Sequence, residues 1–213
     1  VSYLTEEHSR LGHDVTLFAS GDSVTKAHLR AGSRRALRCD TRCEDPLPHL
    51  LRMLHHVVED ADRFDVVHFH TGYAHLPLMW RTRRPSLTTL HDRLDRPDIR
   101  DLYQTFRSLP YVSISHAQRQ PMRWLNWIAN VYHGIPIDRY GLVEHSGQYL
   151  AFVGRMSREK GIEAALEIAR RTGVPIRVAA KVGKEDRDYY EQVVRPQLAH
   201  PLVEYVGEIS DDE

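Results

Sequence analysis

The sequence predicts an α/β protein made of parallel βαβ units. Short apolar runs rich in β-branched and aromatic residues alternate along the chain with longer stretches in which apolar residues recur at helical spacing. The short runs are apolar throughout rather than alternating, as is typical of parallel strands covered by helices on both faces. The composition is that of a globular protein: 213 residues, 41% of them hydrophobic and 27% charged.

In the first part of the chain, strands and helices follow one another in regular order. Residues 24–45 are polar and predict one irregular strand with loops. The helix at 46–63 should face the core with Leu50, Leu51, Leu54, Val57 and Val58. Ser115 is a suitable N-cap for a further helix, which Pro121 should interrupt or kink. The other expected helices are 1–11 and 74–80, and residues 95–108 are expected to form a loop and a helix. The expected strands are 15–19, 65–70, 86–91, 111–114 and 128–132.

A second βαβαβ run follows a polar connector at residues 138–147. Its expected strands are 149–153, 175–180 and 202–206, and its expected helices are 161–171 and 185–198. We therefore predict two Rossmann-like doubly wound domains, residues 1–140 and 141–213. The second is too short for the usual doubly wound domain and is expected to be truncated.

Charge and cysteine content exclude several classes of function. Basic and acidic residues number 29 each, so the formal charge is zero and nothing favours nucleic acid. No apolar run approaches the roughly 20 residues of a membrane-spanning helix, and no signal peptide is visible. Cys39 and Cys43 are the only cysteines, which argues against a disulfide scaffold and for the reducing cytoplasm.

The stretch YLAFVGRMSREKGIEAA (149–165) has the pattern of an anion-binding loop. An apolar strand ends at Gly154, two cations follow at Arg155 and Lys160, and Gly161 opens a helix. Free backbone N–H groups and the dipole at a helix N-terminus favour negative charge. Because Arg can grip phosphate oxygens in a fork and Lys can add a point charge, the pattern predicts a diphosphate ligand.

Histidines recur where the predicted strands end, at His70, His91, His116 and His133. Ligands of parallel sheets bind beyond the carboxyl ends of the strands, so this edge is a candidate site. A zinc site that combines His68, His70 and His75 with His91 is an alternative, although no Asp or Glu completes a ligand set. The same histidines can also be structural.

Five segments together resemble glycosyltransferase family 4. They are FDVVHFHT (64–71), SLTTLHD (86–92), YVSISHAQR (111–119), NVYHGIPIDRY (130–140) and AFVGRMSREKGIEAALEIAR (151–170). The resemblance implies a retaining, metal-independent transferase of GT-B type. It also implies that the N-terminal domain receives the acceptor and that the C-terminal domain holds a nucleotide-diphosphate sugar, with no cofactor beyond that substrate.

The resemblance also implies roles for individual residues. Arg155 and Lys160 would bind the donor diphosphate and stabilise the leaving group, with Gly154 beside them. His91 would be catalytic and lie against the donor sugar. The remaining implied residues lie on the acceptor side of the cleft and are His70, Ser115 and Gly134. No metal is implied.

Two elements of the family pattern are absent from the sequence. A glycine-rich loop after the family's first strand should lie before Val1, and a Glu-x7-Glu signature should lie beyond Glu213. We therefore expect a fragment that lacks the first strand and part of the donor pocket, and that shows little or no transferase activity alone.

The residues leave other functions open. The chain could be another GT-B enzyme, such as a nucleotide-sugar 2-epimerase, or a non-catalytic nucleotide-sugar-binding fragment. The acceptor could be a carbohydrate, a lipid-linked compound or a small molecule. Arg119, Arg123, Trp124 and Trp127 could form a peripheral contact with the inner face of the membrane, or they could belong to an amphipathic helix whose aromatic rings pack inward.

Overall fold

The computed structural model describes residues 1–79, 83–139, 141–142, 144 and 147–209. The chain divides into two compact units, Val1–Tyr140 and Gly141–Glu213, which are described here separately. Trp80, at the end of one predicted helix, lies outside the described residues, as do four residues of the predicted connector: Tyr140, Val143, His145 and Ser146.

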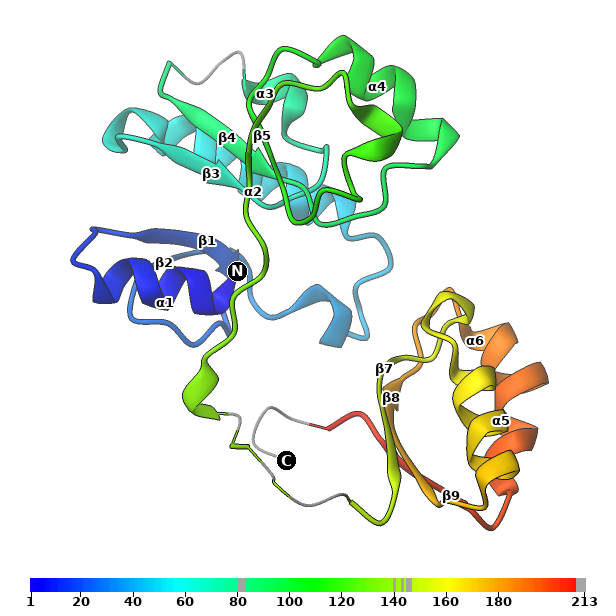
Figure 1. Cartoon of the computed structure of the whole chain (residues 1–213). Coiled ribbons are helices and arrows are strands. Elements are labelled where there is room, and N and C mark those ends of the chain that lie inside the picture. The colour runs from blue at the N-terminus through cyan, green and yellow to red at the C-terminus, as the bar shows by residue number, and fades with distance from the viewer. Residues whose placement is uncertain (80–82, 140, 143, 145–146, 210–213) are drawn as a thin grey trace. The chain divides into compact units, whose positions relative to one another are not determined.

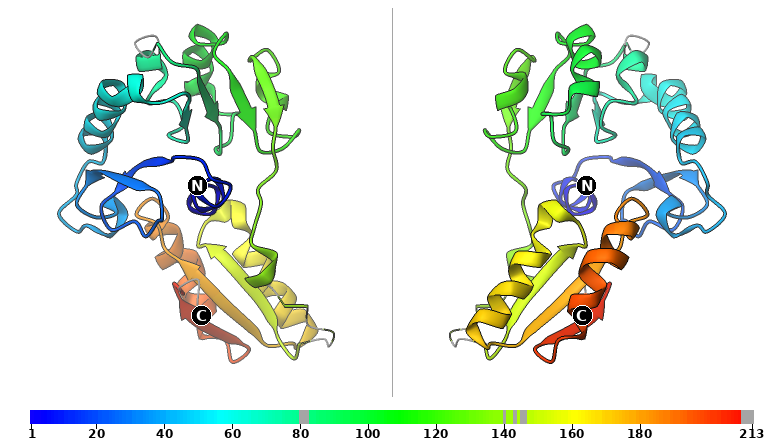
Figure 2. Two further views of the ribbon diagram at one scale, coloured as in Figure 1. Left: turned by 90° about the vertical axis from the view of Figure 1, so that its left-hand side faces the viewer. Right: turned by 90° about the vertical axis from the view of Figure 1, so that its right-hand side faces the viewer.

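The first unit contains two parallel sheets. Strands β3 (Val67–Phe69), β4 (Ser86–Thr89), β5 (Tyr111–Ser113) and β6 (Trp127–Asn130) pair in chain order, and all three pairings are parallel (Figure 2). Strands β1 (Thr16–Ser20) and β2 (His28–Ser33) form a separate parallel pair. All three residues of β5 are buried, as expected for a central strand covered on both faces.

Helices join these strands and close the core of the first unit. They are α1 (Ser2–Arg10), α2 (Leu47–Asp60), α3 (Leu76–Met79) and α4 (Arg100–Thr105). Leu54 and Val57 of α2 are buried as predicted, whereas Leu51 is 49% exposed and does not face the core. The core cluster consists of Leu54, Val57, Val67, Phe69, Leu76, Met79, Leu90, Leu94, Ile99, Tyr103, Tyr111, Met122 and Leu125.

The helix predicted after Ser115 does not form. The Ser115 hydroxyl accepts a hydrogen bond from the backbone N–H of Gln118 (3.1 Å), so it caps a turn, but only the 3₁₀ segment Gln120–Met122 follows. Pro121 has no N–H to donate and disfavours helical backbone at the residue before it, which limits the segment to turns. Trp124 and Trp127 pack against the core, in agreement with the inward-facing alternative for these rings.

The second unit is a three-stranded parallel sheet with helices on one face. Strands β7 (Leu150–Arg155), β8 (Ile176–Lys181) and β9 (Val203–Gly207) pair in that order. Helix α5 (Ile162–Thr172) and the helical segment 187–199 lie on the same side of the sheet (Figure 1). Val153 points to the other side and is 75% exposed. The core cluster of this unit consists of Met156, Ile162, Leu166, Ala169, Ile176, Val178, Ala180 and Val194.

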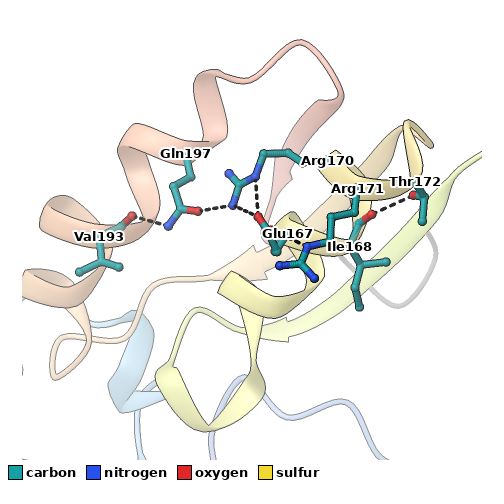
Figure 3. A network of polar contacts seen from close by, with 7 residues as sticks. All are labelled: Glu167, Ile168, Arg170, Arg171, Thr172, Val193 and Gln197. Atoms are coloured by element: carbon teal, nitrogen blue, oxygen red, sulfur yellow. Dashed lines mark hydrogen bonds and ion pairs between the residues drawn. The ribbon is translucent and has the colours of Figure 1, made fainter.

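The helix predicted over 185–198 is divided into three short pieces: α6 (Arg187–Tyr189), a π-helical turn (Tyr190–Val194) and a 3₁₀ turn (Arg195–Ala199). Pro196 interrupts the regular pattern because it removes one backbone donor. A polar network joins the 3₁₀ turn Arg195–Ala199 to α5 (Figure 3). Arg170 donates to Glu167 (3.1 Å) and to the side-chain oxygen of Gln197 (3.1 Å).

Substitution of Leu166 should test the packing of α5. Leu166 is fully buried in the core of the second unit, whereas Ile168 on the same helix is 52% exposed. We expect Leu166→Ala to cost about 2–5 kcal/mol of unfolding free energy because it leaves a cavity. The control Ile168→Ala should cost much less. Urea denaturation followed by far-UV circular dichroism measures both, and equal losses would contradict this packing of α5.

Candidate functional site

The carboxyl edge of the four-stranded sheet brings together three predicted site residues. His70 follows β3, His91 follows β4 and Ser115 follows β5, each within two residues of the strand end. Parallel pairing places these strand ends on one edge. The Nδ1 atom of His70 and the Nε2 atom of His91 are 2.9 Å apart, so one ring donates a hydrogen bond to the other.

Four histidines form a continuous row along this edge, the histidine row: His68, His70, His91 and His133. The ring centroids of His68 and His70 are 4.2 Å apart, and those of His70 and His91 are 5.2 Å apart. His91 and His133 are stacked, with centroids 5.3 Å apart and planes 3° from parallel. His68 also shares a hydrogen bond of 2.8 Å with the hydroxyl of Thr89. The row therefore connects β3 and β4 to the segment after β6.

The environment keeps three members of this row neutral at neutral pH. Burial, reinforced by the neighbouring histidines, lowers the pKa of His70 to about 3, and burial lowers the pKa of His68 to about 4. The pKa of His91 is also lowered, first by burial and then by His133. A hydrogen bond between two imidazoles needs one ring nitrogen that carries no proton and can accept. If both rings were protonated, neither could accept, and the His70–His91 hydrogen bond would be lost.

His91 and Ser115 line one cavity of about 290 Å³. Its walls come from the segments that follow β4 and β5: His91, Asp92, Arg93, Leu94, Asp95, Ile114, Ser115, Ala117, Gln118 and Pro121. Two of the predicted site residues, His91 and Ser115, thus line the same cavity within the first unit.

Gln118 holds the two walls of this cavity together, and the sequence interpretation overlooked it. Its Nε2 donates to the carbonyl oxygens of Leu90 and Asp92, both at 3.0 Å. Its Oε1 accepts from the N–H of Ile114 at 3.0 Å. These bonds fix the backbone on both sides of His91. The partners lie up to 28 residues away in sequence, so no local pattern could indicate this role.

His75 is a structural residue rather than part of the row. Its side chain is fully buried, stacked on Phe69 with centroids 4.2 Å apart. Its two ring nitrogens share hydrogen bonds with the hydroxyls of Thr71 (3.0 Å) and Thr88 (2.7 Å). Both ring nitrogens therefore have hydroxyl partners, and these hydrogen bonds explain the position of His75 without a metal ion.

In the second unit, Arg155 lies at the carboxyl end of β7 among three carboxylates. It donates to Glu159 (2.5 Å) and Glu185 (3.4 Å), and its Nε lies 3.9 Å from the carboxylate of Asp186. The pKa of Glu159 is lowered, first by a hydrogen bond from its own backbone N–H and further by Arg155. Glu159 is thus ionised at neutral pH, and Arg155 is 39% exposed within this cluster.

Lys160 and Gly161 of this loop have open surroundings, whereas Gly154 lies within β7, which continues to Arg155 instead of ending before the glycine. Lys160 is exposed, and its side chain makes no ion pair with any residue that the structure describes. Gly161 adopts a left-handed conformation (φ 74°) directly before α5, which disfavours any other residue there. Gly154 pairs with Ala180 of β8.

In the first unit, Gly134 is exposed, and a Cβ atom at this position would have no neighbouring atom within 4 Å. Protein packing therefore does not require glycine there.

Within the residues that the structure describes, no group of three or more His, Cys, Asp or Glu side chains is arranged so that it could hold a metal ion. None of the helices in the described part of the chain is long and apolar enough to cross a membrane.

Parallel α/β units with site residues at the carboxyl ends of strands are the architecture of GT-B glycosyltransferases. The chain belongs to glycosyltransferase family 4, whose family model matches residues 1–136. No curated protein matches the sequence.

Two similar solved structures support the same fold class. One is AviGT4, described as a glycosyltransferase involved in avilamycin A biosynthesis. It is 20% identical with a TM-score of 0.60, over 95% of this chain and 52% of that chain. The other is a glycosyltransferase from Rickettsia africae ESF-5. It is 13% identical with a TM-score of 0.61, over 98% of this chain and 63% of that chain. The chain thus spans between about half and two thirds of their lengths.

The burial of His75 should make the stability of the first unit depend on pH. Burial lowers the pKa of His75 to about 4, whereas an unfolded histidine titrates near 6.5. The folded pKa is the lower one, so stability is complete above about pH 6.5 and falls as the pH drops toward 4. This residue should cost on the order of 2 kcal/mol at pH 5 relative to pH 7.5. Urea midpoints for the chain and for His75→Gln measure it, and an unchanged pH slope in the variant would contradict the assignment.

Proposed function

We propose that the chain is the part of a retaining glycosyltransferase that engages a nucleotide-diphosphate sugar donor through Arg155 and Lys160. The feature that most supports this proposal is the loop between β7 and α5, which carries both cations at the carboxyl end of a parallel strand. Family membership adds the chemistry of sugar transfer. The acceptor is proposed to be a hydroxyl compound, whether a carbohydrate, a lipid-linked compound or a small molecule.

In the proposed reaction, the bond between the sugar C1 and the diphosphate oxygen breaks as the acceptor oxygen bonds to C1 on the same face. The acceptor proton passes to the leaving phosphate oxygen. Negative charge develops on the diphosphate, and Arg155 and Lys160 neutralise it by hydrogen bonds that strengthen as the bond breaks. With two cations in this role, the proposal requires neither a divalent metal nor a cofactor.

Binding of the diphosphate requires Arg155 to exchange partners. The guanidinium is now shared among Glu159, Glu185 and Asp186. Glu159 and Glu185 are exposed, so their pairs with Arg155 are individually weak, and the largely buried Asp186 lies farther away at 3.9 Å. A diphosphate can offer several charged oxygens to the guanidinium fork at once. Arg155 can therefore exchange these ion pairs for contacts with a diphosphate.

His91 is proposed to contact the donor sugar, and His70, Ser115 and Gly134 to lie on the acceptor side. A neutral His91 can donate or accept a hydrogen bond with a sugar hydroxyl, and it adds no charge that would compete for the diphosphate. The bond to His70 fixes the ring of His91 and sets which of its nitrogens remains available for substrate.

Substitution of Arg155 should weaken binding of a nucleoside diphosphate. We expect Arg155→Ala to reduce the affinity for uridine, guanosine or adenosine diphosphate, whichever binds most tightly, by about tenfold or more, because a bidentate charge-assisted contact is lost. Lys160→Ala should act in the same direction with a smaller effect. Isothermal titration calorimetry measures both.

Arg158 provides a matched control in the same loop. Its guanidinium lies over the ring of Tyr189, 4.6 Å from the ring centroid, and it has no role in the proposed site. Arg158→Ala should leave the affinity within about twofold of the parent. Equal losses in Arg155→Ala and Arg158→Ala would show a general charge effect and count against the assignment.

Product analysis tests the reaction class. Incubation with nucleotide-sugars and a panel of acceptors should release nucleoside diphosphate, and NMR of the product should show the anomeric configuration of the donor. An inverted product would disprove retention. Isotope exchange at C2 of the sugar without any acceptor would instead indicate a 2-epimerase.

A further inference from the structure

A second cavity in the first unit, here the Arg119 pocket, shares no lining residue with the cavity around His91. It has a volume of about 590 Å³ and is lined by His116, Arg119, Gln120, Arg123, Leu125, Asn126 and Trp127. Its walls are the turn after β5 and the start of β6. It is an open depression of the surface rather than an enclosed cavity.

The pocket carries an unbalanced positive charge. Its lining contains two arginines and no carboxylate, although acidic and basic residues are equal in number in the whole sequence. Neither Arg119 nor Arg123 makes an ion pair with a described residue, whereas Arg155, Arg170 and Arg177 each do. The two guanidiniums therefore leave a local charge that an anion could neutralise.

The guanidinium of Arg119 is fixed in place with one nitrogen unsatisfied. Its Nε donates to the hydroxyl of Ser113 (2.6 Å), which in turn donates to Asn130 (2.7 Å). Its plane lies against Trp127, 5.4 Å from the ring centroid. Its Nη2 is shielded from solvent and has no hydrogen-bond partner. An enclosed charged donor without an acceptor is costly, so the other nitrogens of this guanidinium are the ones that can bind an anion in the pocket.

Two further polar side chains of the pocket, Gln120 and His116, can donate hydrogen bonds to a ligand. Arg123 donates to the side-chain oxygen of Gln120, which leaves the amide NH₂ of Gln120 available. His116 is exposed and approaches the ring of Tyr132 edge-on. Two guanidiniums with an amide and an imidazole suit an oxyanion of high charge, and phosphate matches this set better than a single carboxylate.

We propose that the Arg119 pocket binds a phosphate group. The group can belong to a soluble phosphate ester or to a phospholipid headgroup, since both present the same oxygens to Arg119 and Arg123. This site is separate from the proposed donor loop and does not depend on it.

Titration of the full 213-residue chain with glycerol 1-phosphate tests the soluble form. NMR signals of the Arg119 Nε–H and the Trp127 indole N–H should shift and saturate, whereas sodium chloride at equal ionic strength should not produce saturation. Arg119→Gln and Arg123→Gln should each weaken binding about tenfold. Arg119→Gln removes the hydrogen bond to Ser113 and could impair folding. Arg123 is exposed, so Arg123→Gln should fold and tests the site independently.

Arg100 provides the matched control. It also lies over an indole ring, that of Trp124 (5.6 Å), and donates to the carbonyl of Pro121 (3.3 Å), but it does not line the pocket. Arg100→Gln should leave the affinity unchanged. A loss equal to that of Arg123→Gln would overturn the proposed site, because it would reflect only the loss of positive charge.

Vesicles distinguish the two sources of phosphate. Co-sedimentation with phosphatidylcholine vesicles that contain phosphatidylglycerol should depend on Arg119 and Arg123 if the ligand is a headgroup. Binding of glycerol 1-phosphate without vesicle binding identifies a soluble ester. Absence of saturable binding to both probes would overturn the proposal.

Discussion

Parallel pairing of short, buried strands is the constraint on which the rest of the structure depends. Parallel strands all end at the same edge, so residues that follow different strands become neighbours whatever their separation in sequence. His70 and His91 are 21 residues apart and share a hydrogen bond for this reason. In the second unit the same rule places Arg155 at the end of β7 beside Lys181 of β8, its partner in register. The site chemistry is thus set by where strands stop, and the helices serve mainly to cover them.

The strand ends of the two units differ in their charge. His68, His70 and His91 of the histidine row are uncharged at neutral pH because burial disfavours the imidazolium form. The loop after β7 is highly charged, with Arg155 among three carboxylates and Lys160 exposed beside them. An uncharged hydrogen-bonding surface suits hydroxyl groups of a sugar, and a charged loop that can exchange ion pairs suits a diphosphate.

Much of this organisation could be predicted from local sequence, and the failures have specific causes. The strand positions and helix α5 follow from apolar runs and from the spacing of Ile162, Leu166 and Ala169. The helices expected after Ser115 and over 185–198 are divided into short turns because Pro121 and Pro196 each remove a backbone donor. Gln118 could not be found, because its partners are supplied by a neighbouring strand end. The burial of His75 was equally hidden, since Phe69, Thr71 and Thr88 surround it only after the sheet forms.

A comparison of Arg119 with Arg155 shows why charge alone does not define a site. Both arginines lie close to strand ends, and both have at least one nitrogen held by a neighbouring side chain. Arg155 is satisfied by carboxylates, so an anion must displace them, and its affinity for a ligand is the difference between two sets of ion pairs. Arg119 has a hydroxyl and an indole ring as neighbours, which orient the guanidinium without neutralising it. An anion that enters there has no carboxylate to displace, because none lines the pocket. For equal ligand charge, the prepared but unneutralised arginine therefore has the larger free energy to gain from binding.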